Sequence, residues 1–123
     1  MIDGTITFLP TRDLDAIDAF FNALEIPMVL DQGDCRIYRI GEAAFWGFCK
    51  HLNEVPQPAS AVVLTLLVDD VGAWHARCQE KGLPTDGPAR VNERFGIEHF
   101  FVAMPDGYRL EVQRFLDPNW ATT

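Results

Sequence analysis

The stretch FLPTRDLDAIDAFFNALEIP, residues 8–27, has the same pattern as a later stretch, TLLVDDVGAWHARCQEKGLP, residues 65–84. A shift of 57 residues superimposes the two without a gap. The residues that then coincide are Leu9 with Leu66, Asp13 with Asp70, Leu14 with Val71, Ala16 with Ala73, Ala19 with Ala76, Ile26 with Leu83, and Pro27 with Pro84. Self-similarity at a fixed period indicates a repeated structural unit. The sequence therefore predicts a duplicated fold.

In each copy an apolar segment leads to an aspartate that is suited to cap a helix. The carboxylates of Asp13 and Asp70 can accept hydrogen bonds from the free amides of a first helical turn, so we expect a helix to begin at each. Apolar residues then recur at the spacing of one helix face. These core stripes are Leu14, Ile17, Phe21 and Leu24 in the first helix, and Val71, Trp74 and Cys78 in the second. We expect the second helix to end near Gly82.

Strand-like segments follow each helix. CRIYRI and AAFWGF, residues 35–40 and 43–48, flank a short Gly-Glu turn and predict a hairpin. HFFVAM and YRLEVQRF, residues 99–104 and 108–115, flank PDG and predict a second one. Each half thus reads as strand, helix, strand and hairpin, which gives an α+β fold of two tandem βαβββ units. We assign unit one to about residues 1–52, a linker to about 53–60, unit two to about 61–116 and a tail to 117–123.

Composition restricts the class of partner. The chain has 123 residues, of which 48% are hydrophobic, and a net charge of −8. No apolar run reaches the roughly 18 residues of a membrane span, and the scattered basic residues disfavour nucleic acid. The N-terminal residues lack the pattern of a secretory signal, which predicts a cytoplasmic location. Cys35, Cys49 and Cys78 form no CxxC pair, so we expect three buried, reduced thiols.

A resemblance to a known family rests on the two βαβββ units and on three segments: LPTRDLDAIDAFF (residues 9–21), VDDVGAW (68–74) and PDGYRLE (105–111). In these features the chain resembles the glyoxalase / bleomycin-resistance / extradiol-dioxygenase group, also called the vicinal oxygen chelate superfamily. The first of these segments is most similar to the drug-binding bleomycin-resistance proteins. The resemblance implies a cup-shaped mixed sheet and a homodimer. Because this fold hosts many functions, the site has to be argued from its own residues.

In the metal enzymes of the group, the resemblance implies one ligand from the first strand of each unit and one from the last hairpin strand of each. These positions fall on Ile6 and Val63, and on Trp46 and Glu111. A divalent ion needs about three protein ligands, and only Glu111 has a suitable side chain. We therefore predict no metal and no cofactor. His51 and His75 are expected at the surface.

Symmetric pairing of the second hairpin about Asp106 sets the face on which Glu111 lies. It places Phe101 opposite Glu111 and His99 opposite Gln113, and paired residues share a face. That face would carry His99, Phe101, Arg109, Glu111 and Gln113. Three roles for Glu111 remain open: an ion pair with Arg109, contact with a ligand in the cup, or metal ligation or general-base catalysis, the last with His99 as its acid-base partner.

The first hairpin contributes two further candidates. Alternation in AAFWGF puts Trp46 and Phe48 on one face, where they either line the cup or pack in the core. Aromatic faces with a carboxylate suit a cationic or heteroaromatic small molecule. The segment 84–98 carries Arg90 and Arg94 and is expected to form a lid.

The ligand-binding candidates are therefore Trp46, Phe48, His99, Phe101, Arg109, Glu111 and Gln113. They favour a metal-independent small-molecule binding protein, such as one that sequesters a bleomycin-like or other cationic aromatic antibiotic, over an enzyme. One alternative is a vicinal oxygen chelate lyase, dioxygenase or transferase that uses Glu111 in an unconventional metal site or an acid-base pair. Another is a regulatory domain whose cup is filled by side chains.

Overall fold

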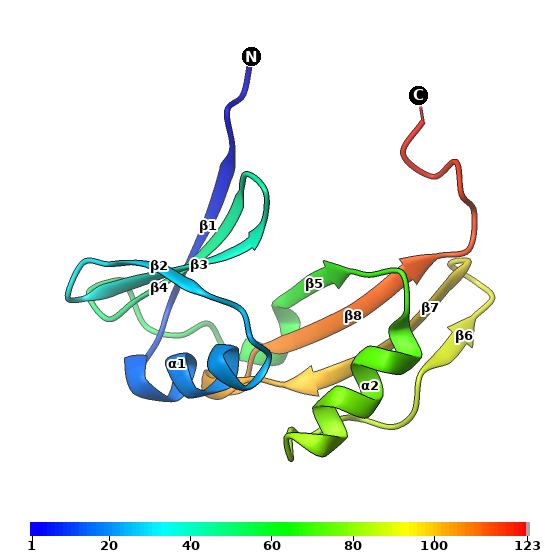
Figure 1. Cartoon of the computed structure of the whole chain (residues 1–123). Coiled ribbons are helices and arrows are strands. Elements are labelled where there is room, and N and C mark those ends of the chain that lie inside the picture. The colour runs from blue at the N-terminus through cyan, green and yellow to red at the C-terminus, as the bar shows by residue number, and fades with distance from the viewer. Residues whose placement is uncertain (123) are drawn as a thin grey trace. The chain divides into compact units, whose positions relative to one another are not determined.

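The computed structural model describes residues 1–122 and consists of two successive βαβββ units (Figure 1). The first contains β1 (Thr5–Pro10), α1 (Leu14–Ala23), β2 (Met28–Asp31), β3 (Cys35–Gly41) and β4 (Ala44–Cys49). The second contains β5 (Val63–Leu67), α2 (Val71–Glu80), β6 (Arg90–Asn92), β7 (Ile97–Ala103) and β8 (Arg109–Phe115). Short 3₁₀ turns span Ala59–Ala61 and Pro105–Gly107. The predicted α+β class and the duplication are confirmed.

Each unit has its own four-stranded mixed sheet, and the two sheets have the same topology. The strand orders are β1-β4-β3-β2 and β5-β8-β7-β6. In each sheet the first strand pairs in parallel with the last, and the remaining pairs are antiparallel. By their contacts, Met1–Ala61 and the turn Met104–Gly107 form one compact unit, and Val62–Ala103 with the chain from Tyr108 onward forms the other.

Both helices begin at the predicted caps. The Asp13 carboxylate accepts a hydrogen bond from the amide of Ala16 at 3.1 Å, and that of Asp70 accepts one from Ala73 at 3.0 Å. The whole predicted stripe of α1 is buried. In α2, Trp74 is only half-buried and lies under the guanidinium of Arg77. Within residues 1–122, no helix is long and apolar enough to cross a membrane.

The core of the first unit is built around the ring of Phe21 on α1. This ring lies 4.5 Å from that of Tyr38, 5.5 Å from Phe48 and 6.2 Å from Trp46, measured between centroids. The Tyr38 hydroxyl donates to Asp18 at 3.0 Å. Burial, with this nearby carboxylate, raises the pKa of the Tyr38 phenol. The aromatic residues of β3 and β4 on this face therefore serve to attach the helix to the sheet.

Two of the three cysteines are joined in a disulfide, Cys35 to Cys49, whereas Cys78 is free and buried. The expectation of three reduced thiols was therefore wrong for Cys35 and Cys49. The reason is strand register, because Cys35 and Cys49 stand directly opposite each other on β3 and β4. Residues 14 apart in the sequence carry no local signal of that pairing.

The turn between β7 and β8 is held by the side chain of Asp106, which has a positive φ of 67°. Its carboxylate accepts hydrogen bonds from the Thr11 hydroxyl at 2.6 Å and from the Arg12 amide at 2.9 Å. The side chain is only 4% exposed. Aspartate tolerates the left-handed conformation better than most residues, and the two bonds hold it there.

We predict that Asp106→Ala lowers the free energy of unfolding by about 2–4 kcal/mol, because it leaves the two donors unpaired and puts alanine at positive φ. Asp106→Asn keeps one acceptor oxygen and tolerates the turn, so we expect a smaller loss. Urea unfolding of the three proteins measures the difference. An alanine variant within about 0.5 kcal/mol of the parent protein would contradict this role of Asp106.

Candidate functional site

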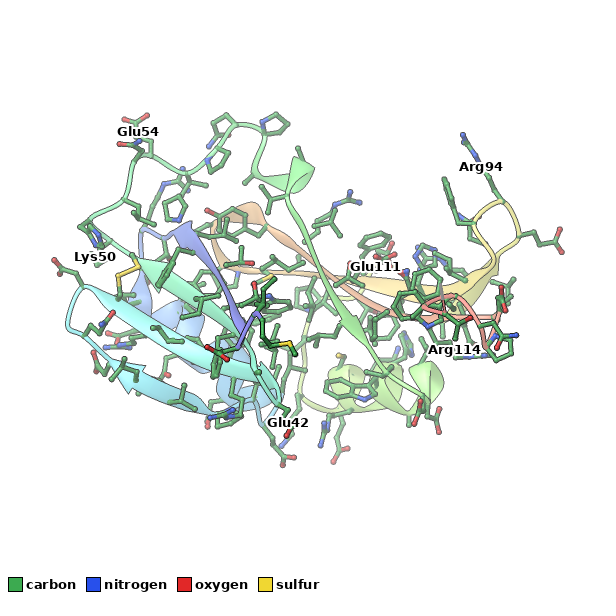
Figure 2. The ribbon with its side chains drawn as sticks, turned by 90° about the horizontal axis from the view of Figure 1, so that it is seen from above. Glu42, Lys50, Glu54, Arg94, Glu111 and Arg114 are labelled. Atoms are coloured by element: carbon green, nitrogen blue, oxygen red, sulfur yellow. A yellow bond between two sulfur atoms is a disulfide. The ribbon has the colours of Figure 1, made fainter. Side chains whose placement is uncertain are left out.

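The hairpin of β7 and β8 has the register that the sequence predicted. Phe101 pairs with Glu111, His99 with Gln113 and Ala103 with Arg109. Paired residues share a face, so this register brings together all five candidates of the second hairpin. On the other side of β8, Thr65 of β5 pairs with Glu111. Glu111 thus occupies a central strand of its sheet, between two neighbours (Figure 2).

Glu111 is held by hydrogen bonds to both of its carboxylate oxygens. Its Oε2 lies 2.6 Å from Nδ1 of His99, and its Oε1 accepts from the Thr65 hydroxyl at 2.8 Å. The side chains of His99 and Glu111 are 11% and 12% exposed. An ionised carboxylate only accepts, so Nδ1 of His99 donates and Nε2 is the ring nitrogen that remains for another partner. The carboxylate therefore fixes the orientation of the imidazole. Thr65 was missed because a threonine in a strand carries no distinctive signal.

An aromatic ring and a cation extend the site along the strands. The Phe101 ring lies edge to face against the His99 ring, with centroids 5.2 Å apart. The guanidinium carbon of Arg109 lies 4.6 Å from the centroid of the Phe101 ring. On the other side of Glu111, Gln113 is buried. We call His99, Phe101, Arg109, Glu111 and Gln113, together with Thr65, the polar row.

Trp46 and Phe48, the two candidates from the first hairpin, lie elsewhere. They are 6% and 0% exposed and pack against Phe21 of α1, so the interpretation as core packing describes them. The predicted alternation of β4 is correct, but the face that carries these two rings is the one that the helix covers. Tyr38 pairs with Trp46 and shares that face.

The position in the first unit that corresponds to Glu111 is Gly47. Thr65, the partner of Glu111, corresponds to Phe8 under the shift of 57 residues, and Phe8 pairs with Gly47. Trp46, which the sequence predicted as the position equivalent to Glu111, is therefore one residue away from the true equivalent. A Cβ atom on Gly47 would lie 2.5 Å from Cδ1 of Phe8, so the phenyl ring takes the space that a larger side chain would need.

The donor atoms do not fit the metal that the resemblance implies. Ile6 and Val63 are exposed and apolar, and Gly47 has no side chain. Among residues 1–122, Glu111 belongs to no group of three metal-binding side chains. Of the other histidines, His51 is exposed as expected, whereas His75 is half-buried with its ring against Phe100.

A pocket of about 270 Å³ borders the polar row at Phe101 and Arg109. The rest of its wall includes Pro84, Thr85 and Asp86. The segment expected to form a lid instead supplies the edge strand β6, in which Arg90 pairs with His99. The β-bridge of Thr85 with Val102 also ties this segment to the sheet, which explains why it does not stand free as a lid.

Asp86 fastens this wall of the pocket to β7. Arg90 donates two hydrogen bonds to its carboxylate, at 2.9 and 2.7 Å, and the amide of Phe101 donates a third at 2.9 Å. The hydrogen bonds from Arg90, the largest cause, and from Phe101 lower the pKa of Asp86 to about 2. The ionised carboxylate is therefore the form that the folded protein favours.

We predict that the stabilisation from Asp86 is lost in acid. Because the pKa of Asp86 is lower in the folded protein than its ordinary 3.8, its contribution is complete above about pH 4 and disappears as the pH falls towards 2. The difference in unfolding free energy between the parent protein and Asp86→Asn should narrow over that range in urea titrations. In an Arg90→Ala background the effect of Asp86→Asn should lose most of its pH dependence. A difference that stays constant from pH 6 to 2 would contradict this account.

Comparison with known proteins places this geometry in a known fold. No protein-family model matches the sequence, and no curated protein matches it. Among solved structures, a glyoxalase/bleomycin resistance protein/dioxygenase from Nocardioides superimposes with a TM-score of 0.77 at 15% identity, covering 96% of this chain and 86% of that one. The chain has the glyoxalase/bleomycin-resistance fold.

Two further structures with this fold differ in what they are described to do. A bleomycin-binding protein complexed with bleomycin has a TM-score of 0.73 and 22% identity, covering 92% of this chain and 98% of that one. Lactoylglutathione lyase from Agrobacterium tumefaciens has a TM-score of 0.71 and 20% identity, covering 95% of both chains. One is a binding protein and the other an enzyme, so the fold alone does not choose between binding and catalysis.

Proposed function

We propose that the polar row binds a small molecule. The observation that carries this proposal is the burial of His99, Glu111 and Gln113 side by side on one sheet face. Burying polar side chains in a sheet costs free energy unless each has partners, and apolar residues would pack there at no such cost. The 2.6 Å contact between His99 and Glu111 orients the imidazole in advance. A pre-oriented polar group beside an aromatic ring is typical of a ligand site.

The groups of the polar row suggest how a ligand would be held. Nε2 of His99 and the Gln113 amide offer hydrogen bonds, and the Phe101 ring offers a stacking surface. The net charge of −8 attracts cationic molecules over a distance. Arg109 already lies against the Phe101 ring, so a cationic guest would have to displace its guanidinium or bind the ring elsewhere. A flat aromatic guest can instead stack on the guanidinium plane.

The ligand class that we propose is a bleomycin-like or other cationic aromatic antibiotic, which the protein would sequester without a metal. The likeness to a bleomycin-binding protein complexed with bleomycin and to a bleomycin resistance determinant of transposon Tn5 supports this class. So does the segment LPTRDLDAIDAFF, residues 9–21, which resembles such proteins. The absence of a fitting set of metal ligands around Glu111 within residues 1–122 is consistent with metal-free binding.

The proposal is tested by calorimetric titration with metal-free bleomycin. We expect saturable binding, and we expect Phe101→Ala and His99→Ala each to raise Kd about tenfold, equivalent to the loss of about 1.4 kcal/mol of stacking or hydrogen bonding. Amide resonances of β7 and β8 followed in the same titration would locate the ligand. Tryptophan fluorescence is a poor reporter, since Trp46 is buried under α1.

Glu98→Gln is a matched control for changes in the polar row. Glu98 precedes His99 on β7, projects to the opposite face and pairs with Arg114 at 2.7 Å. This variant should bind bleomycin as the parent protein does. If bleomycin does not bind saturably, or if the variants of His99 and Phe101 bind it unchanged, the proposed site is wrong.

The dyad of His99 and Glu111 favours acid-base catalysis as a second candidate. A carboxylate that accepts from one imidazole nitrogen fixes the tautomer of the ring and presents the other nitrogen for proton transfer. Glu111→Gln would then abolish turnover of a substrate while its binding persists. In the sequestration proposal the same variant weakens binding and there is no turnover to lose.

We also propose a homodimer, which the resemblance implies. The first strand of each sheet exposes apolar side chains, Ile6 and Phe8 on β1 and Val63 and Leu67 on β5, and such side chains are suited to an interface. Light scattering during size-exclusion chromatography should give a mass near twice the 13.9 kDa of the chain. A mass of one chain at micromolar concentration would contradict the dimer.

A further inference from the structure

The open end of the hairpin of β3 and β4 carries three side chains that the polar row does not use. Cys35 begins β3, Cys49 ends β4, and His51 follows two residues later. Nδ1 of His51 lies 3.6 Å from Sγ of Cys35. The Nδ1 atom and the two Sγ atoms lie within 4.8 Å of one another. Figure 2 shows the disulfide close to the labelled Lys50.

These distances suit a soft metal ion once the disulfide is reduced. Zinc binds thiolate sulfur at about 2.3 Å and imidazole nitrogen at about 2.0–2.1 Å in a tetrahedron. That geometry separates a sulfur from a nitrogen by about 3.6 Å and two sulfurs by about 3.8 Å. The present distance between Cys35 and His51 already matches the first value. The second requires the sulfurs to part, which breaking their bond permits by rotation of the cysteine side chains.

Hydrogen bonds hold the backbone around the two cysteines in place. The amide of Lys50 donates to the carbonyl of Asp34 at 2.8 Å, and that of Gln32 donates to the carbonyl of Cys35 at 2.8 Å. The amide of Thr11 donates to the carbonyl of Cys49 at 3.1 Å. These bonds do not involve sulfur, so they keep the two cysteines opposite each other after reduction. A pre-placed ligand set lowers the entropy that metal binding must overcome.

We propose that Cys35, Cys49 and His51 form a redox-controlled binding site for a thiophilic divalent cation such as Zn²⁺. Two molecules of a low-molecular-weight thiol break the S–S bond, and two cysteine thiols and one molecule of the oxidised disulfide of that thiol are formed. The cation then displaces the two thiol protons and takes the lone pair of Nδ1 on neutral His51. Oxidation by the small disulfide reverses these steps and releases the cation.

The site would keep one coordination position for water. His51 is exposed, so a hydrated ion can approach its ring from solvent. Three ligands and a water suit exchangeable rather than permanent binding. In a reducing compartment the thiol form would predominate, and the protein would bind the cation there.

The test uses the whole chain, with Co²⁺ as a coloured substitute for Zn²⁺. One sample is reduced with a phosphine, which is then removed, and the other keeps its disulfide. Mass spectrometry verifies the two states, because the oxidised chain is lighter than the reduced chain by two hydrogens. The reduced chain should bind one equivalent of Co²⁺ with a thiolate-to-cobalt charge-transfer absorption, and one equivalent of Zn²⁺ should abolish that absorption. The oxidised chain should show neither. Equal binding by the two forms, or none by the reduced form, would overturn the proposal.

Two variants assign the ligands, and a third is the control. Cys35→Ser should remove most of the charge-transfer absorption, and His51→Ala should weaken Zn²⁺ binding at least about tenfold, because each removes one of three protein ligands. Leu52→Ala is the matched control, since it shortens an exposed neighbour that has no metal-binding atom, and it should bind as the parent does. Unchanged affinity of His51→Ala would refute the three-ligand site.

This site and the polar row are distinguishable in the same experiment. A cation held by His99 and Glu111 would bind to oxidised and reduced protein alike, would give no thiolate absorption and would survive Cys35→Ser. Conversely, the redox site should be unaffected by Glu111→Gln. Failure of bleomycin binding would therefore leave the redox proposal standing, and the reverse also holds.

Discussion

The pairing of β7 with β8 is the constraint on which the candidate site depends. A strand alternates its faces with every residue, so a shift of one residue would turn His99 and Phe101 away from Glu111. The turn that sets this register places Asp106 at positive φ, and the hydroxyl of Thr11 and the amide of Arg12 hold its carboxylate. The geometry of the polar row thus rests on a turn whose hydrogen-bond partners come from the start of the chain.

The two units share a topology but have diverged in chemistry. At equivalent positions the second sheet carries Thr65 beside Glu111, and the first carries Phe8 beside Gly47. In the second unit a carboxylate and an imidazole satisfy each other in a largely buried setting. In the first unit a phenyl ring covers a glycine, and the polar chemistry lies instead at the hairpin end, with Cys35, Cys49 and His51. The same topology therefore carries different polar side chains in the two units.

The two oxygens of the Glu111 carboxylate find their hydrogen-bond partners in residues other than Arg109. Its oxygens bond to His99 and Thr65, while the guanidinium of Arg109 lies over Phe101. The imidazole therefore presents its second nitrogen, and the carboxylate orients the ring. This arrangement is suited to holding a ligand in one orientation, which is the proposed function, and the same geometry is also compatible with moving a proton.

The sequence by itself determined the features that depend on neighbouring residues. The repeat, the caps at Asp13 and Asp70 and the pairing about Asp106 follow from local hydrogen bonding and from side-chain periodicity, and each was predicted correctly. Only the tertiary structure decided which face of β4 the helix covers, and so that Trp46 and Phe48 pack in the core. It also decided that Cys35 meets Cys49. Alternation defines two faces of a strand without saying which is buried, and contacts between residues distant in sequence exist only once the strands have paired.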